Sequence, residues 1–507
     1  MTGKVHCPMS TGRRGFLKGV LAVGAAPIVV PAGVLGKTAP SNKLQIAILG
    51  CGRVAATFDL QGLVDNHDLA RLTTICDVDS ERLPYFKQVA AQRYAYYKLG
   101  ADHVKMEMDY RRVLDDPGID GVMICTPDHW HARMAVEACL KGKDVYVQKP
   151  MAFSIDESEA ILEAVRATGR VFHIGTQSRT DRGFGGPIRK GVEYVLSGRL
   201  GKLSRVDVGI PDIEPADEGR APIYERTPDP DDFDFDLWLG PAPADVRYSQ
   251  LRTHWRMRDP NGNLPLAGRN GRYMNNGWLQ IQDYCMGNIC GWGTHNMDIA
   301  QWGMGGAAPL SVKAEHVKFL KGRLFNVHDD CLLAYTYPGG VRLRCGTPRY
   351  SGIPRGVGFH GENGDWIWVS QTTTAIPERR RIDTAYRPKA DFWRACEASR
   401  KELIAGEPEK QVVRNKARNH HTPWLLGMRS RKDTHITVEE ANASTISCIL
   451  GYHAMNNPGL TIEWDPVKRD FKDPSLARLR SVVARPQFSA IAELEEIRKR
   501  RNAWCAK

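Results

Sequence analysis

The chain has 507 residues, too many for one ordinary hydrophobic core, and its 42% hydrophobic content is typical of a soluble globular protein. Of its net charge of +12, five positive charges lie in residues 1–37 and an excess of six lies in residues 467–507, so the body between them is nearly neutral. A near-neutral body argues against nucleic acid as a partner, because polyanion binding needs a basic face.

Residues 1–42 carry a targeting pattern. Arg13 and Arg14 precede a mildly apolar run, residues 19–35, which is the pattern of a twin-arginine signal for the export of folded proteins. We therefore expect the twin-arginine export machinery as a partner and a periplasmic or otherwise exported protein. A membrane tether through an uncleaved signal is the alternative, although the prolines in this run would leave only a short and broken span.

Twelve cysteines are scattered singly along the chain, without any C-x-x-C pair. Structural zinc sites and redox motifs use paired spacing, so we expect no metal site. Cys51, Cys76 and Cys125 fall at predicted loop or strand positions, where a thiol behaves as a small buried hydrophobe.

Residues 43–175 alternate short apolar runs with amphipathic stretches, which predicts an α/β domain with a parallel sheet of βαβ units. The predicted strands cover residues 44–49, 72–76, 121–125, 145–147 and 171–174. The predicted helices cover residues 53–65, 81–93, 110–114, 131–141 and 154–168.

A glycine-rich loop follows the first predicted strand. Gly50, Gly52, Arg53 and Val54 belong to the run Gly-Cys-Gly-Arg-Val-Ala, which matches G-x-G-x-x-A and opens a helix. The glycines allow a tight turn and a close approach to a pyrophosphate at the helix N-terminus. Asp77 ends the second strand, where an acid binds the ribose 2′-hydroxyl and repels a 2′-phosphate, so NAD is favoured over NADP. The alternative is a glycine turn with a helix-capping aspartate.

Two further polar segments follow strands and so lie at the carboxyl edge of the sheet, where ligands of open α/β sheets bind. The first provides Thr126, Pro127, Asp128, Trp130 and His131, and the second provides Gln148 and Lys149. We expect these residues to contact the cofactor, with Trp130 beside the nicotinamide or the substrate. For Lys149 the alternative is an ordinary surface lysine, and for His131 it is a helix cap.

Residues 176–466 are predicted to form a second, α+β domain with an antiparallel sheet. Its predicted strands cover residues 310–319, 331–337, 341–345, 357–360 and 366–369, with turn signals at Pro338-Gly339-Gly340 and Asn363-Gly364. Residues 211–288 form a long Pro-, Asp- and Gly-rich excursion or lid. The acidic run 229–236 lacks the EF-hand spacing and is interpreted as a solvated loop. Residues 467–507 form a basic tail with a predicted helix over 491–501.

These motifs together resemble the glucose-fructose oxidoreductase and inositol dehydrogenase (Gfo/Idh/MocA) family. The resemblance covers about residues 43–466 and rests on the glycine loop, Thr126-Pro127-Asp128 with His131, Lys149-Pro150 and the segment 291–302. The run Leu237-Trp238-Leu239-Gly240-Pro241 is similar to a phrase of the exported, twin-arginine branch. The resemblance implies an NAD(P)-binding Rossmann domain, a C-terminal domain with a large open, mostly antiparallel sheet, and a homo-oligomer.

The resemblance also implies the roles of several side chains. Lys149 and His295 would be the catalytic pair facing the nicotinamide. An imidazole near neutrality is a suitable base for a carbinol proton, and an ammonium stabilises the developing oxyanion. Gln177 and Arg179 match positions at the cleft mouth, and Asp298 matches a position that is structural or faces the substrate.

Two positions depart from the family pattern. Gln148 stands where members usually carry a glutamate before the lysine, so a charge is replaced by an amide. Gly291 stands where the family has its catalytic aspartate, four residues before the histidine; Asp283 and Asp298 are possible substitutes.

Three functional hypotheses follow. The first is NAD-dependent oxidation of a hydroxyl of a sugar, cyclitol or glycoside, or reduction of the matching ketone. The second is a glycosidase or lyase that oxidises the sugar transiently, eliminates and returns the hydride. The third is a non-catalytic sugar- or cofactor-binding protein, motivated by Gly291; retention of Lys149 and His295 speaks against it.

Overall fold

The computed structural model describes residues 43–180, 186–212, 231–244, 277–321, 325–370, 374–375, 419–481, 485–489 and 495. The signal pattern, the tail helix predicted over 491–501 and most of the excursion 211–288 lie outside the described residues. Among the described helices, none combines the length and the apolarity needed to cross a membrane.

The first sheet is parallel and six-stranded, in the order β3-β2-β1-β4-β5-β6. Its strands are β1 (Leu44–Leu49), β2 (Ala70–Cys76), β3 (Lys105–Glu107), β4 (Gly121–Ile124), β5 (Asp144–Val147) and β6 (Phe172–Ile174). The predicted Rossmann architecture is thus confirmed. The short strand β3 was missed, because its three residues are mostly exposed and carry no apolar alternation.

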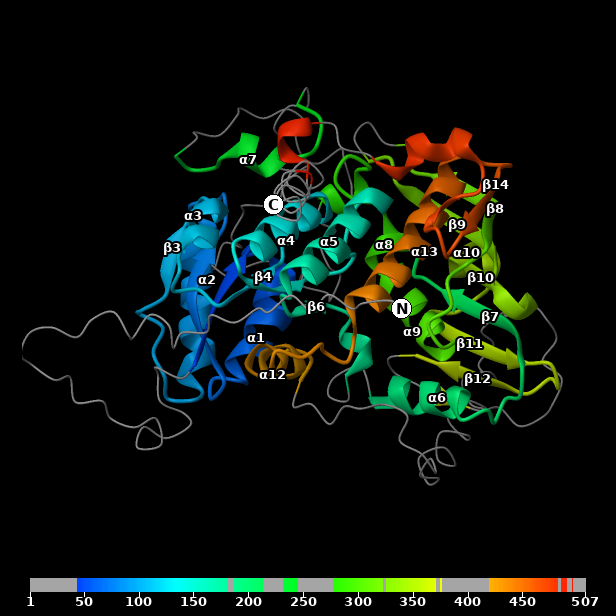
Figure 1. Cartoon of the computed structure of the whole chain (residues 1–507), viewed down its shortest axis with the longest axis horizontal. Coiled ribbons are helices and arrows are strands. Elements are labelled where there is room, and N and C mark those ends of the chain that lie inside the picture. The colour runs from blue at the N-terminus through cyan, green and yellow to red at the C-terminus, as the bar shows by residue number, and fades with distance from the viewer. Residues whose placement is uncertain are drawn as a thin grey trace, which may run out of the picture. The chain divides into compact units, whose positions relative to one another are not determined.

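Helices cover this sheet as Figure 1 shows in blue and cyan. They are α1 (Leu60–Val64), α2 (Arg82–Ala95), α3 (Tyr110–Asp115), α4 (His131–Leu140) and α5 (Ile155–Thr168). Ser154 caps α5 by accepting from the Glu157 amide, and Gly169 ends it in the left-handed conformation, as the sequence signals indicate. The helix predicted over 53–65 differs: it opens with a π-helical turn, Ala55–Asp59, before α1.

The second sheet has nine strands in the order β13-β12-β11-β7-β10-β9-β8-β14-β15 and is mostly antiparallel, as predicted. They are β7 (Leu203–Gly209), β8 (Ser311–Phe319), β9 (His328–Thr336), β10 (Arg342–Gly346), β11 (Gly356–Gly361), β12 (Trp366–Val369), β13 (Thr374–Ala375), β14 (Thr461–Asp465) and β15 (Asp470–Phe471). The sequence did not predict β7, which pairs parallel with β10 and antiparallel with β11.

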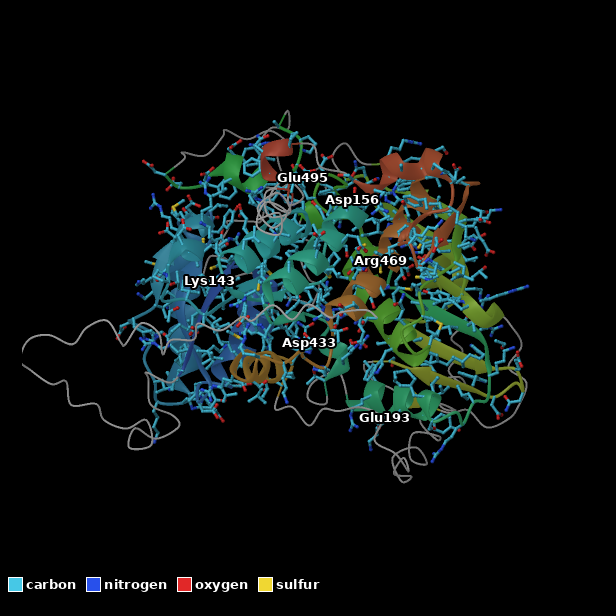
Figure 2. The ribbon with its side chains drawn as sticks, viewed as in Figure 1. Lys143, Asp156, Glu193, Asp433, Arg469 and Glu495 are labelled. Atoms are coloured by element: carbon cyan, nitrogen blue, oxygen red, sulfur yellow. The ribbon has the colours of Figure 1, made fainter. Side chains whose placement is uncertain are left out.

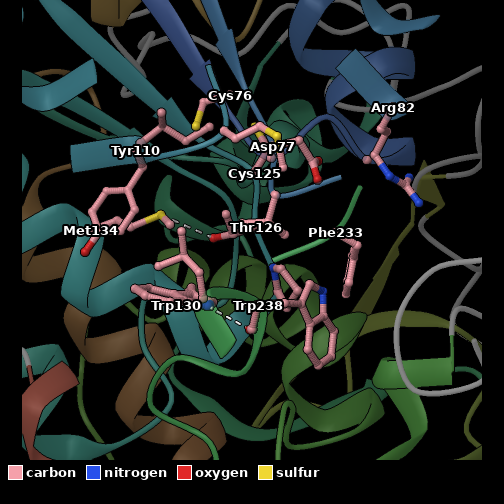
Figure 3. A pocket seen from close by; sticks show the side chains of 17 residues that line it. Cys76, Asp77, Arg82, Tyr110, Cys125, Thr126, Trp130, Met134, Phe233 and Trp238 are labelled. Carbon is pink, nitrogen blue, oxygen red and sulfur yellow. Dashed lines mark hydrogen bonds between the residues drawn. The ribbon is translucent and has the colours of Figure 1, made fainter. Parts of the chain in front are cut away.

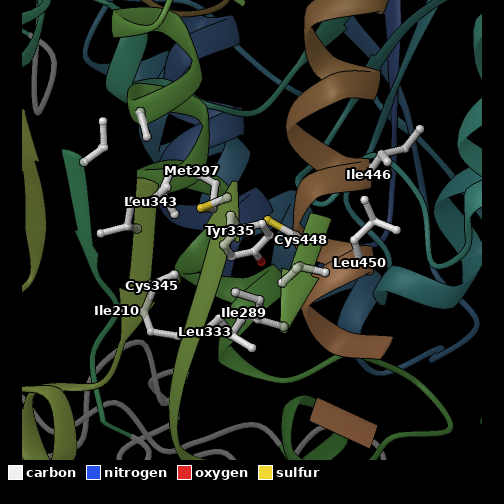
Figure 4. Packing of buried hydrophobic residues seen from close by; sticks show 14 of the residues in the cluster. Ile210, Ile289, Met297, Leu333, Tyr335, Leu343, Cys345, Ile446, Cys448 and Leu450 are labelled. Carbon is white, nitrogen blue, oxygen red and sulfur yellow. The ribbon is translucent and has the colours of Figure 1, made fainter. Parts of the chain in front are cut away.

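The remaining described helices are α6 (Gly186–Leu196), α7 (Phe235–Leu239), α8 (Asn288–Gly291), α9 (Gly293–Gly303), α10 (Pro348–Ser351), α12 (Thr422–Ser430) and α13 (Val438–Asn456). The longest, α13, begins with a capping box between Thr437 and Glu440. It packs against α5 of the first domain and against β8 and β9 of the second sheet. Figure 4 shows its Ile446, Cys448 and Leu450 beside Leu333 and Tyr335 of the sheet. This helix therefore belongs to the contact between the two domains.

Two later segments return to the first domain. Trp424, Leu425 and Met428 of α12 pack in the core of the parallel sheet. Farther along, Arg469 pairs with Glu159 of α5 at 3.3 Å and Arg480 pairs with Asp156 at 2.8 Å, in a region where Figure 2 labels Asp156 and Arg469. The domain boundaries at residues 175 and 466 stay predictions.

Candidate active site

The glycine loop after β1 is fixed by close backbone packing. Gly50 has φ +90°, and a Cβ there would lie 2.8 Å from the backbone of Cys125 and Thr126 at the end of β4. Only glycine allows both this conformation and this approach. The chain reverses its strand order between β1 and β4, which is the switch point where open α/β sheets bind ligands.

Asp77 lies beside this loop, directly after β2. Its carboxylate accepts hydrogen bonds from the Cys51 amide at 2.8 Å and from the Asp79 amide at 3.1 Å. Burial raises the pKa of Asp77 to about 6, and the positive charge of Arg82 opposes that rise. The acid is thus held by backbone at the position where a ribose 2′-hydroxyl binds.

A pocket opens between the glycine loop, the ends of β2 and β4, and α7. Its lining includes Gly50, Gly52, Asp77, Arg82, Tyr110, Thr126, Pro127, Trp130, Met134, Phe233, Leu237 and Trp238. Figure 3 shows Asp77, Thr126, Trp130 and Trp238 around it. The apolar walls, the glycine cradle and the acid fit a dinucleotide, so the residues present suit NAD.

The described part of the excursion contributes to this pocket. Phe233 forms a β-bridge with Asp79, and the Trp238 carbonyl accepts from the ring nitrogens of His129 and Trp130 at 3.2 and 3.0 Å. A Cβ at Gly240 would collide with the Trp130 ring, which explains this glycine of the Leu-Trp-Leu-Gly-Pro run. Trp130 therefore lines this pocket, and its predicted place beside the nicotinamide or the substrate stays a prediction.

Lys149 follows β5 and is partly buried, which excludes the ordinary surface lysine. Burial lowers the pKa of its amine, and the Asp128 carboxylate opposes this most strongly. Burial raises the pKa of Asp128 to about 7, with the Lys149 ammonium opposing in turn. Arg53, at the start of the helical segment that Val54 caps, is close enough for its charge to lower the Lys149 pKa.

His131 links the two predicted polar segments. Its Nδ1 lies 2.6 Å from the Pro150 carbonyl and its Nε2 lies 3.0 Å from the Thr126 carbonyl. Burial lowers the pKa of His131 to about 4, and the two carbonyls oppose that fall. With both nitrogens facing backbone, His131 positions the loop that carries Lys149.

His295 lies in the first turn of α9 and is buried. Its Nδ1 has no hydrogen-bond partner among the described residues. Burial lowers its pKa well below 6.5, and the charges of Lys149 and Arg355 lower it further. Lys149 and His295, which are far apart in the sequence, are thus brought into electrostatic contact. Arg355, which stacks on Trp292 at 3.6 Å, is a cation that the sequence did not reveal.

Arg179 and Asp298 bind each other. The guanidinium of Arg179 donates two hydrogen bonds to the Asp298 carboxylate, at 2.7 and 2.8 Å, and a third to Glu440 at 3.1 Å. Ser444 of α13 also donates to Asp298, at 3.0 Å. This buried pair fixes α9, and with it His295, against α13, so the structural alternative fits Asp298 better than the substrate-facing one. Gln177 donates to the Tyr146 hydroxyl at 3.4 Å.

Three histidines, His173, His420 and His435, lie near enough to one another to share an ion. The ring nitrogens of His173 lie within hydrogen-bond distance of the Thr434 hydroxyl and the His420 carbonyl. The ring nitrogens of His420 lie within hydrogen-bond distance of the Thr180 hydroxyl and the Ile174 carbonyl. These contacts occupy both rings with the protein's own groups, so the arrangement is a hydrogen-bonded network. All nine described cysteines are free thiols, and eight of them are buried.

A parallel sheet with a glycine loop after β1 and an acid after β2 defines a dinucleotide-binding domain of the Rossmann class. Residues 44–176 match the family model described as "Oxidoreductase family, NAD-binding Rossmann fold" (GFO_IDH_MocA). These residues are therefore similar to the NAD-binding domain of the Gfo/Idh/MocA oxidoreductases, and the predictions of that resemblance, of the Rossmann fold and of NAD as the cofactor are confirmed.

Known relatives agree with this assignment. Scyllo-inositol 2-dehydrogenase (NAD(+)) of Bacillus subtilis is 32% identical over 161 residues, 32% of this chain and 42% of that protein. Glycosyl hydrolase family 109 protein 2 of Shewanella sp. (strain ANA-3) is 30% identical over 154 residues, 29% of this chain and 32% of that protein. The matched segments thus span less than half of these relatives.

Among solved structures, the fold resembles the aldose-aldose oxidoreductase of Caulobacter crescentus with a TM-score of 0.54 and 17% identity. The likeness covers 83% of this chain and 99% of that structure. At this identity it supports the two-domain fold and nothing finer.

Proposed function

We propose that the chain uses NAD to oxidise a hydroxyl of a sugar, a cyclitol or a glycoside, or to reduce the matching ketone. One observation supports the proposal most strongly: Lys149 follows β5 at the carboxyl edge of the parallel sheet, the edge that also carries the NAD-type pocket, and its charge reaches His295 of α9. Cyclitols and sugars are the substrates in the names of the relatives.

The two side chains divide the chemistry of a carbinol. NAD, when bound, supplies the hydride acceptor. The low pKa of His295 keeps its ring neutral, so its free Nδ1 is able to take the hydroxyl proton. The Lys149 ammonium, which Asp128 favours, stabilises the negative charge that grows on the same oxygen. Arg179 and Asp298 hold the helix that carries the base.

The first test is to purify the protein, denature it and measure the NAD(H) and NADP(H) released, then to follow NADH formation with myo-inositol, scyllo-inositol and D-glucose. We expect the purified protein to release NAD and to form NADH, followed by its absorbance, with at least one of the three carbohydrates. A purified protein that releases no nicotinamide cofactor and does not bind added NAD would contradict the proposal. Bound NAD without any transfer of hydride to or from a carbohydrate would leave a binding protein.

A second candidate is a reaction in which the hydride returns to the product, as in the transient oxidation used by a glycosidase. Its support is the aromatic wall of the pocket, which Phe233, Trp238 and Trp130 line. Phe488 packs edge to face against Trp130, with ring centroids 5.6 Å apart, and Arg485 pairs with Asp236 at 2.8 Å. A relative named as a glycosyl hydrolase points the same way. Retention of NAD through extensive dialysis, with cleavage of an aryl glycoside and no net NADH, would favour this reaction.

We also propose export through the twin-arginine machinery and association into a homo-oligomer through the open sheet. The support for export is the Arg13-Arg14 pair before an apolar run. An Arg13→Lys, Arg14→Lys variant that still reached the periplasm would contradict export by this route. Light scattering that gave a monomer mass would remove the oligomer.

A further inference from the structure

Asp59 is a fully buried aspartate beneath the carboxyl edge of the parallel sheet. It is the last residue of the π-helical turn Ala55–Asp59 that follows the glycine loop. Such turns insert a residue into a helix and recur at functional sites. This one lies between the glycine loop and α1, where a regular helix was expected.

Four donors surround the Asp59 carboxylate. The Gln148 amide nitrogen lies 2.9 and 2.8 Å from its two oxygens, the His421 Nε2 lies 3.0 Å away, and the Cys125 thiol donates at 3.3 Å. The Tyr146 hydroxyl also bonds to it, and burial together with this carboxylate raises the pKa of the tyrosine. The two carboxyl oxygens of Asp59 thus face several polar groups of the surrounding strands and loop.

The partners of Asp59 come from the ends of β4 and β5 and from the loop before α12. Two glycines leave room for these partners. A Cβ at Gly62 would lie 2.0 Å from the His421 ring, and a Cβ at Gly175 would lie 2.6 Å from the Gln148 side-chain oxygen. The Gln148 amide is therefore held on one side by Asp59 and on the other by the Gly175 backbone. Its neighbour in the chain is Lys149.

We propose that Asp59 is a positioning residue of this site, which holds the Gln148 amide and thereby sets the place and the charge of the Lys149 amine. The sequence has no acid at position 148, but the first helical segment brings the Asp59 carboxylate within hydrogen-bond distance of the Gln148 amide. Asp59 also acts over space, because its charge favours the Lys149 ammonium. The inference rests on the proposed role of Lys149 in the reaction.

The test moves the carboxylate from one partner to the other. The full chain is prepared with Asp59→Asn, with Gln148→Glu and with both changes. Each is melted, and each is acetylated briefly with trace acetic anhydride, with Lys149 quantified by mass spectrometry against the exposed Lys141 in the same sample. Asp65→Asn is the matched control, since Asp65 lies at the end of α1 and bonds to Gln61 and Tyr97.

We expect Asp59→Asn to raise the relative acetylation of Lys149 by about threefold or more, because a lost carboxylate disfavours the ammonium and loosens the strand end. Gln148→Glu should lower the acetylation, because a second carboxylate favours the ammonium. Each single change should lower the Tm, and the double variant should regain most of that loss, because one amide and one carboxylate again face each other. Asp65→Asn should leave Lys149 acetylation unchanged.

Two outcomes would overturn the proposal. One is a fall in Tm on Asp59→Asn with Lys149 acetylation unchanged, which assigns a merely structural role. The other is a double variant whose loss of Tm equals the sum of the two single losses. Neither measurement needs a substrate, so this inference can fail while oxidoreductase activity is found, or stand while that activity is absent.

Discussion

The cofactor half and the substrate half of the candidate site are built from different kinds of structure. In the cofactor half, the glycine loop and Asp77 follow two adjacent strands, and backbone amides hold the acid. In the substrate half, Lys149 and His295 come from different domains, and Asp59 bonds to Gln148, the residue before Lys149. The first half is specified by short motifs, whereas the second depends on how the domains pack.

The largest effect should come from the substrate half. Lys149→Ala removes the cation at the reacting oxygen, and we expect turnover to fall by about a thousandfold, with NAD still bound. Lys141→Ala, at an exposed pair with Asp115, is the control and should not change turnover. Steady-state rates and the NAD released on denaturation check both variants. Full turnover in the Lys149 variant would contradict the proposed chemistry.

The change Gly50→Ala should disrupt NAD binding in the cofactor half of the site. The new Cβ would lie 2.8 Å from the backbone after β4, at φ +90°, so we expect NAD affinity to fall by about a hundredfold or the domain to lose stability. Gly142→Ala is a matched control, because it also has a positive φ, +75°, but has open space around its Cβ. Titration with NAD and thermal melting of both variants distinguish crowding by the new Cβ from backbone strain. If both variants lost NAD affinity equally, crowding at Gly50 would have no part in the effect.

The same division explains what the sequence predicts. Strands β1, β2, β4 and β5, the glycine loop and Asp77 follow from local apolar runs and turn chemistry. The paired segments at Thr126 and Lys149 follow because parallel strands place their carboxyl ends at one edge. For the substrate half, the family resemblance named His295, but no local pattern placed it beside Lys149.

Other contacts had no local signal at all. Asp59 is buried at the end of a π-helical turn, where the apolar periodicity predicts a regular helix. Its partner His421 is 362 residues away in the sequence. The family resemblance singled out Arg179 and Asp298, but it did not predict that they pair with each other, because this contact depends on the packing of α9 and α13. Phe233 joins the pocket through a single bridge to Asp79, a contact without periodicity.

A smaller effect should come from Asp77→Asn. The change keeps the shape but removes the charge that excludes a 2′-phosphate, with Arg82 nearby to accept one. We expect NAD affinity to fall by about tenfold and NADP affinity to rise. Asp109→Asn, which alters the N-cap of α3 and does not line the pocket, controls for lost stability. An unchanged NAD-to-NADP ratio would remove Asp77 from the ribose site.

The smallest effect should come from Gly291→Asp, which puts an acid where the family has one. A Cβ at Gly291 would meet only the Asn288 side chain, at 3.4 Å, so the protein should fold with an unchanged Tm. Gly291 ends α8 and His295 lies in the first turn of α9. Because Trp292 between the two helices has right-handed helical dihedral angles, a carboxylate at position 291 should lie near the His295 ring, favour its protonated form and raise its pKa.

The sign of this change is fixed by the role of the base. Rate is lost as pH falls through the pKa of His295, which burial holds well below 6.5 in the native chain. Gly291→Asp should therefore move the acid limb of the pH–rate profile upward by about half a unit or more. Gly291→Asn, which adds similar bulk without charge, should leave the limb in place. A limb that moved equally in both variants would show that His295 is not the group that titrates.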